Sequence, residues 1–111
     1  MSAQVIRLGT LRQRLKHQTF VDVPDGAGGV ARHYVLVDSI WGRVETASTD
    51  FAIAEERARA GHAMRITVRA PTTIATGDRL LLGSRIFHVE AVSTADSWGR
   101  FARCRCREEQ P

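Results

Sequence analysis

Residues 63–70 read Ala-Met-Arg-Ile-Thr-Val-Arg-Ala, in which apolar and polar side chains alternate from the methionine onward. Successive side chains of a β-strand point to opposite faces. Met64, Ile66 and Val68 therefore share one face, and Arg65 and Arg69 share the other with the threonine between them. We expect a strand with one buried face and one face in solvent or in an interface.

Turn signals divide the rest of the chain into further short strands. Gly83-Ser84 is typical of a two-residue hairpin turn, and residues 24–29 (Pro-Asp-Gly-Ala-Gly-Gly) of a longer hairpin connection. About six short strands with tight turns favour a mainly β fold, a small antiparallel β-barrel or sandwich. The expected strands besides residues 63–70 are 16–23, 30–37, 39–44, 79–82, 85–92 and 100–107, and 30–44 is also compatible with one long bent strand.

One segment interrupts this series of strands. A polar stretch, residues 45–49, precedes a predicted short inserted α-helix at about residues 50–60, with Thr49 or Asp50 as its cap and Gly61 as its stop. A helix of this length is marginal in water on its own, so it must lean on the barrel or on a neighbouring subunit. Function is expected in this helix and its flexible loop, because binding elements tend to sit on loops held by a rigid scaffold.

The length of 111 residues fits a single domain, residues 1–111. Residues 1–10 are a possible docking arm and residues 108–111 a frayed tail. The net charge is +4 and Lys16 is the only lysine, so the cationic groups are arginines spread along the chain, which does not by itself indicate nucleic-acid binding. No apolar run reaches the length of a membrane span, no signal-peptide core begins the chain, and a cytoplasmic origin is the default expectation.

Residues that carry chemistry do not gather in any recognisable pattern. Cys104 and Cys106 lie two apart in an expected strand, which indicates core-facing thiols rather than a disulfide or a metal site. Glu55-Glu56 would diverge around a helix, so they indicate a solvated face. The sequence therefore predicts no catalytic residue, no metal site and no cofactor. Four histidines fall on four different segments and are expected at the surface or in an interface: His17, His33, His62 and His88.

A second function remains open on residues alone. Phe101 is expected to share a face with Arg103, Arg105 and Arg107, close to Arg100. Small barrels bind single-stranded nucleic acid through a cationic groove with stacking aromatic rings. A single-stranded nucleic-acid-binding module is therefore the alternative function, whereas the favoured interpretation pairs these arginines with acids of a neighbouring subunit.

The order of these features resembles the phage head–tail joining family, also called head-closure or stopper proteins, which includes equivalents in gene transfer agents. The similarity covers nearly the whole chain, and its pattern is structural rather than catalytic. It rests on residues 9–15 (Gly-Thr-Leu-Arg-Gln-Arg-Leu), the strand 17–23, the glycine-rich turn 25–29, residues 39–45 with Trp41 and with Gly42 where alanine is common, the inserted segment 50–60, the strand 62–69, the hairpin 79–89 with the aromatic Phe87, and the closing strand 103–108.

The resemblance implies a structural virion protein without enzymatic activity. A ring of copies would lie under the portal and adaptor, close the DNA channel after packaging and dock the tail. Six copies are favoured, with twelve as the alternative. The implied partners are other copies of the chain, the adaptor or portal-side connector, a tail terminator or tail-tube protein, and double-stranded DNA that passes without sequence recognition. No membrane partner is expected, and the particle, of a phage or a gene transfer agent, would assemble in the bacterial cytoplasm.

Two sets of residues follow from this expected role. A segment of marginal stability suits a gate, in which acids would repel phosphate and arginines would attract it. The channel-facing loop and helix would contain Thr46, Ala47, Ser48, Thr49, Asp50, Phe51, Glu55, Glu56, Arg57 and Arg59. The ring or partner interface would contain Val5, Ile6, Arg7, Leu8, Arg65, Arg69, Arg103, Arg105 and Arg107.

Overall fold

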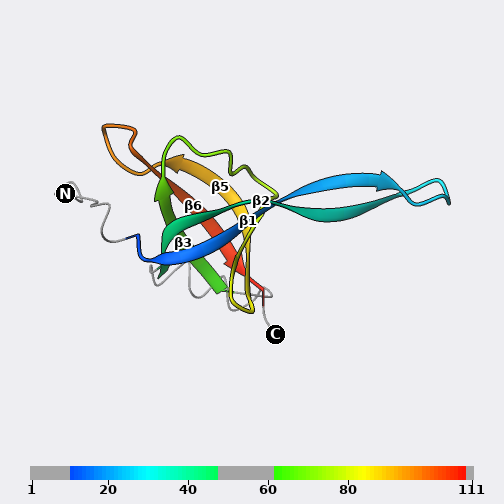
Figure 1. The fold of residues 1–111 in the computed structure, drawn as a ribbon, viewed down its shortest axis with the longest axis horizontal. Helices are drawn as coiled ribbons and strands as arrows, with labels where there is room; N and C mark the ends of the chain where they lie inside the picture. The colour runs from blue at the N-terminus through cyan, green and yellow to red at the C-terminus, as the bar shows by residue number, and fades with distance from the viewer. Residues whose placement is uncertain (1–10, 48–61, 110–111) are drawn as a thin grey trace.

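The structure, a computed structural model, describes residues 11–47 and 62–109. Within these residues all regular structure is β, and six antiparallel strands close into a barrel in the order β1-β2-β3-β6-β5-β4 (Figure 1). The expected mainly β fold is confirmed, and the barrel is the form observed. The predicted helix at 50–60 and its loop lie outside the described residues, as does the possible docking arm at 1–10. The strands are β1 (Gln13–Pro24), β2 (Val30–Thr46), β3 (His62–Arg69), β4 (Arg79–Leu82), β5 (Arg85–Thr94) and β6 (Phe101–Glu108).

The barrel interior is filled by the side chains that the alternating patterns place on one face. Met64, Ile66 and Val68 of β3 are buried, as predicted. Cys104 and Cys106 of β6 are also buried and belong to the same core, so the expected core-facing thiols are confirmed. Each large apolar side chain buried in this way stabilises the fold by roughly 1.5–3 kcal/mol. The remaining core contributions come mainly from Leu15, Leu80, Phe87 and Val89.

β1 and β2 are longer than the barrel that they enter. They pair with each other along the whole of β1, but β2 pairs with β3 only over residues 42–46, and β1 pairs with β4 only over residues 16–18. Residues 18–37 therefore project as a two-stranded ribbon, which we call the arm (Figure 1). A register shift between His17 and Gln18 lies where the arm leaves the barrel. Residues 30–44 thus belong to one long strand, one of the two expected possibilities.

The predicted turns are observed. Asp25 holds the tip of the arm, because its Oδ1 accepts hydrogen bonds from the backbone N–H groups of Ala27 (2.8 Å) and Gly29 (3.1 Å). These bonds lower the pKa of Asp25 below its ordinary value. Gly83 adopts a positive φ of 60° in the two-residue turn between β4 and β5.

Two details concern the ends of the chain and the membrane. β6 continues to Glu108, within the expected frayed tail, and the backbone N–H of Glu109 donates to the carbonyl oxygen of Ile86 at 2.8 Å. Across residues 11–47 and 62–109 the structure contains no helix with the length and apolar character of a membrane span.

Candidate functional site

The connection between β2 and β3 leaves and re-enters the barrel at one rim. The backbone N–H of Ala47 donates to the carbonyl oxygen of Ala63 at 3.1 Å, and Thr46 lies opposite Met64 in the register. The two ends of segment 48–61 are therefore held side by side. Antiparallel neighbours usually need a loop of about two to five residues, and longer connections are usually functional or linker segments.

This rim contains only part of the expected channel-facing set. Thr46 is exposed and Ala47 is half-buried at the base of the connection. Their position at the end of β2 fits a support for a loop. The other expected channel-facing residues lie outside the described part of the chain: Ser48, Thr49, Asp50, Phe51, Glu55, Glu56, Arg57 and Arg59.

The outer face of β3 and β6 brings together several of the expected interface arginines. Arg65 lies directly opposite Arg105, and Arg103 lies opposite Thr67. Like charges opposite each other in a sheet destabilise it. The enclosed Nε of Arg65 has no hydrogen-bond partner among the described residues. The fold therefore places two arginines directly opposite each other on this face.

Acids lie on both sides of this cationic face, and Glu45 of β2 is directly opposite Arg65. Glu90 of β5 lies 3.0 Å from the Nη2 of Arg107 and 3.9 Å from the Nε of Arg105. Arg69 is separate from the group, because it ends β3 and is exposed beside the groove described below. The expected interface residues Val5, Ile6, Arg7 and Leu8 lie outside the described residues.

Phe101 corrects the prediction of an exposed aromatic platform. Its side chain is buried, with 6% of its surface exposed, although the alternation of β6 places it with the arginines. Phe101 is the first residue of the strand, and the backbone next to it is hydrogen-bonded on both sides. The N–H of Ala70 donates to the carbonyl of Arg100 at 2.8 Å, and the N–H of Ala95 donates to that of Phe101 at 2.9 Å. A buried ring cannot stack on a base, so the alternative nucleic-acid-binding function loses the residue on which it rested.

A buried polar cluster, not predicted from the sequence, lies where the arm leaves the barrel. His17 is 2% exposed, which corrects the expectation of a surface or interface histidine. Its Nε2 lies 2.7 Å from Oδ2 of Asp78, and the hydroxyl of Thr19 donates to Oδ1 of Asp78 at 2.8 Å. The backbone N–H of Ala75 also donates to Asp78, at 3.0 Å. Burial raises the pKa of Asp78, but these hydrogen bonds, with His17 first, outweigh burial and hold it below its ordinary value.

The chemistry of this cluster is structural. Thr19 donates to Asp78 and not to His17, so no hydroxyl is paired with the imidazole as a nucleophile is paired with its base. The Nδ1 of His17 faces a second carboxylate, Asp38, at 3.5 Å. The cluster therefore links β1 and β2 to the loop before β4. Leu15, His17 and Thr19 are spaced two residues apart in one strand, so their side chains share a face. This spacing places the histidine on the same face as a core leucine and could have predicted its burial.

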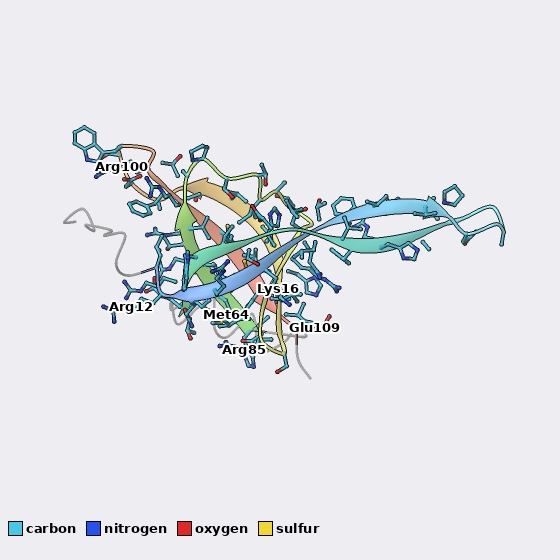
Figure 2. The ribbon with its side chains drawn as sticks, in the orientation of Figure 1. Arg12, Lys16, Met64, Arg85, Arg100 and Glu109 are labelled. Atoms are coloured by element: carbon cyan, nitrogen blue, oxygen red, sulfur yellow. The ribbon has the colours of Figure 1, made fainter. Side chains whose placement is uncertain are left out.

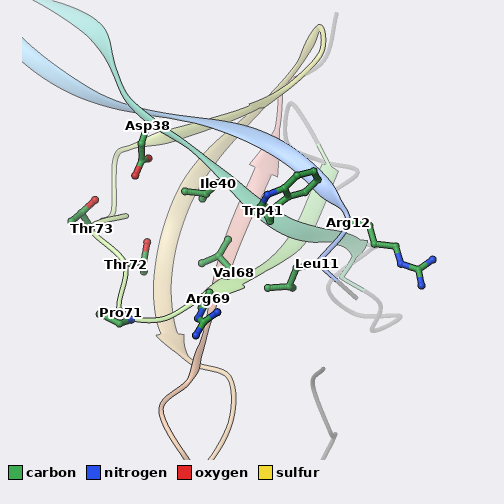
Figure 3. A pocket seen from close by; sticks show the side chains of 10 residues that line it. All are labelled: Leu11, Arg12, Asp38, Ile40, Trp41, Val68, Arg69, Pro71, Thr72 and Thr73. Atoms are coloured by element: carbon green, nitrogen blue, oxygen red, sulfur yellow. The ribbon is translucent and has the colours of Figure 1, made fainter. Parts of the chain in front are cut away.

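An open groove, also not predicted from the sequence, lies beside β2. It has a volume of about 720 Å³ and lies where β2 has separated from β3, because their pairing begins only at residue 42 (Figure 3). Its side chains are mainly apolar, with the half-exposed Trp41 at one side and Asp38 as its acid. The apolar residues that line it are Leu11, Ile40, Trp41, Val68 and Pro71.

The remaining histidines agree with their expected positions. His33 and His62 are exposed, and His88 is partly exposed with its Nε2 3.1 Å from Oε1 of Glu109. Within the described residues no three His, Cys, Asp or Glu side chains group in a way that could hold a metal ion.

The two thiols are not joined in a disulfide. Burial raises the pKa of Cys104 to about 11. Burial and the neighbouring Cys104 raise that of Cys106 further. Both thiols are therefore poor nucleophiles at neutral pH.

Comparison with known proteins gives two kinds of match. Residues 6–109 match a family described as phage head completion protein. Among solved structures, the chain is similar to a chain from the virion of a native gene transfer agent particle, with 29% identity, a TM-score of 0.67, and coverage of 90% of this chain and 96% of that one. It is also similar to protein SF1141 from Shigella flexneri 2a, with 22% identity, a TM-score of 0.69, and coverage of 93% and 96%. The second likeness concerns the fold alone. No curated protein matches the chain.

Proposed function

This chain belongs to the phage head completion protein family, and we propose how it closes the DNA channel within the head–tail connector. The membership confirms the family that the sequence pattern suggested. The protein is a structural component of the virion with a role in the connector and its closure, and it assembles with other head and tail proteins. A structural virion family argues against an enzymatic activity.

In our proposal the segment that joins β2 to β3 closes the DNA channel. The single observation that supports this role is the rim geometry: Ala47 and Ala63 are hydrogen-bonded at 3.1 Å, so the barrel holds both ends of segment 48–61 at one place. Such a segment can change conformation while the strands on either side remain paired, as a gate requires. Thr46 and Ala47 form its base, and the other expected channel-facing residues belong to the segment itself.

In the same proposal, the copies form a cyclic ring of six, with twelve as the alternative. A ring repeats one head-to-tail contact, so each copy needs two different surfaces that fit each other. The cationic face with Arg65, Arg103 and Arg105 provides one such surface, because it gathers arginines from two adjacent strands on the outside of the barrel. The ring contacts an adaptor or portal-side protein above and a tail terminator or tail-tube protein below. Double-stranded DNA passes through it without sequence recognition.

A loop-replacement variant tests the closure mechanism. Residues 48–61 are replaced by Asn-Gly, the two-residue hairpin turn that suits strands whose ends are already adjacent. We expect a folded barrel and normal incorporation into particles, but loss of packaged DNA, measured as the nuclease-protected DNA per particle. A matched control replaces the same residues by a Gly/Ser segment of equal length, which keeps the bulk of the loop and removes its sequence. Particles of the Asn-Gly variant that retain DNA at the wild-type level would overturn the gate assignment.

A further inference from the structure

The arm has two open edges. The outer edge of β1 has no partner strand among the described residues beyond residue 18, and the outer edge of β2 has none from residue 30 to residue 41. Along each edge, the backbone N–H and C=O groups of every second residue point outward and can pair with another strand. The β1 edge covers residues 19–24 and the β2 edge covers at least residues 30–37, so each is long enough to pair with a strand of ordinary length.

The arm has only part of the usual protection against such pairing. Natural edge strands are commonly blunted by charges, by prolines, by bulges or by short length. In the arm these features are limited to Asp22 and Arg32 on the edges, Pro24 at the end of β1 and the register shift at the root. Here residues 19–23 read Thr-Phe-Val-Asp-Val and residues 30–37 read Val-Ala-Arg-His-Tyr-Val-Leu-Val, which are rich in residues that favour strands. Both faces of the arm also expose apolar side chains, since Val21, Val23 and Val35 on one face, beside His33, have between 41% and 44% of their surface exposed and Leu36 on the other has 58%. A two-stranded ribbon is only marginally stable in water, so we expect the arm to be covered when the protein is at work.

We propose that the arms of neighbouring copies pair edge to edge, with the β1 edge of one arm on the β2 edge of the next. The inference rests on the cyclic ring proposed above and identifies one of its contacts. β1 runs outward from the barrel and β2 returns, so arms that point the same way place antiparallel strands side by side. The contact joins two different edges, and its repetition around an axis closes a continuous antiparallel sheet, a crown of arms.

Charge complementarity selects a second copy of the chain as the occupant. The β1 edge carries Asp22 and the β2 edge carries Arg32, which lie opposite each other within one arm with a 3.1 Å distance between Oδ1 and Nε. Both side chains remain 41–49% exposed, so each can also face the opposite charge of the adjacent arm. Pairing of like edges would instead bring acid toward acid or arginine toward arginine, which is unfavourable. On the other face, the valines of adjacent arms would meet in one apolar band.

Mixed cysteine variants test the crown in assembled particles. Asp22→Cys and Arg32→Cys are made as separate full-length variants and incorporated together into particles, which are then oxidised or treated with a short bismaleimide. Neighbouring strands bring opposite residues within disulfide range. The native thiols do not compete, because both are buried. The Arg100→Cys variant, mixed with Asp22→Cys, is the matched control, since Arg100 lies at the end of the barrel away from the arm (Figure 2).

The expected result is a covalent dimer in the mixture of Asp22→Cys and Arg32→Cys, and dimer at background level in either variant alone and in the control mixture. Dimer formation by Asp22→Cys alone would indicate pairing of like edges and would overturn the proposal. Absence of any dimer in particles that contain both variants would overturn it as well. Incorporation of the protein into particles, measured by quantitative mass spectrometry, reports separately on the proposed connector function, so the two failures are distinguishable.

Discussion

The Nε2 atom of His17 lies 2.7 Å from the Oδ2 atom of Asp78, and both side chains are almost completely buried. His17 belongs to β1 at the root of the arm, and Asp78 lies in the loop directly before β4. The contact therefore fixes the arm to the barrel at the point where its pairing with other strands ends. A connector subunit that presents an arm to a neighbour needs such an anchor, because a loosely held arm would pay a larger entropic cost on assembly.

The first prediction concerns the stability that this contact supplies. Asp78→Ala removes the acceptor of the bonds from His17, Thr19 and Ala75, and leaves their polar groups buried. We expect the free energy of unfolding at pH 7 to fall by roughly 3 kcal/mol or more, measured by urea denaturation. Asp22→Ala is the control, because its exposed ion pair with Arg32 is screened by solvent and contributes little to stability. Equal losses in the two variants would contradict the anchor.

The second prediction is the pH dependence of the same group. The fold lowers the pKa of Asp78, so the ionised carboxylate stabilises the folded state fully above the unfolded pKa of about 3.9. This stabilisation disappears as the pH falls through the still lower folded pKa. Denaturation curves between pH 7 and pH 2 should therefore show a steeper acid loss of stability for the wild type than for Asp78→Asn. If the free energy of unfolding fell equally for both proteins between pH 7 and pH 2, Asp78 would not titrate as the structure requires.

The third prediction concerns Gly42, which is buried against Leu15 and Thr67. A Cβ at this position would lie 2.6 Å from Cδ1 of Leu15 and 3.1 Å from the backbone oxygen of Thr67. Gly42→Ala should therefore overpack the core and lower the free energy of unfolding by about 1–3 kcal/mol. The double variant Gly42→Ala with Leu15→Val should lose less than the sum of the single variants, because the shorter side chain makes room. Strict additivity, or a stable Gly42→Ala protein, would contradict the close contact.

The fourth prediction concerns the arginines of the cationic face. Arg105→Gln removes the repulsion of Arg65 and the distant contact with Glu90, so the free energy of unfolding should change by no more than about 0.5 kcal/mol. The same variant should be depleted from particles in competition with the wild type, if this face meets an acidic partner. Arg100→Gln, on an exposed turn, should leave both quantities unchanged. A variant that is both stable and fully competitive would remove this face from the interface.

The fifth prediction uses the buried thiols as reporters of folding. Cys104 and Cys106 are fully buried and their thiolates are suppressed at neutral pH. A thiol reagent at pH 8 should label the native protein only as fast as the barrel opens, whereas protein in concentrated guanidinium should be labelled at once. Rapid labelling of native protein would show that β6 is not packed as described.

Local patterns were sufficient to predict much of the barrel. The alternation in residues 63–70 predicted the buried face of β3, and the Gly83-Ser84 turn predicted the β4–β5 hairpin. The alternation of side chains along the last strand likewise placed both cysteines in the core. These features depend on neighbouring residues, and turn chemistry and the two-residue period of a strand record them in the sequence.

The features that the sequence did not reveal depend on distant residues. His17 and Asp78 lie 61 positions apart, so no local pattern connects them. The length of the arm follows from where β3 and β4 stop pairing, which the composition of β1 and β2 does not record. Phe101 lies on the face of the arginines, as the alternation predicts, but its ring is buried, which neighbouring residues in the sequence do not reveal. The groove beside Trp41 exists for the same reason as the arm, since β2 separates from β3 there.

An electron cryomicroscopy reconstruction of the assembled connector tests the central claim most directly. The quantity to measure is the distance of each Cα atom from the symmetry axis. We predict that the rim formed by Ala47 and Ala63 faces the axis, that segment 48–61 enters the channel, and that each barrel contacts its neighbours in a closed ring. A reconstruction in which this rim faces outward, with the channel bounded by another part of the barrel, would contradict it.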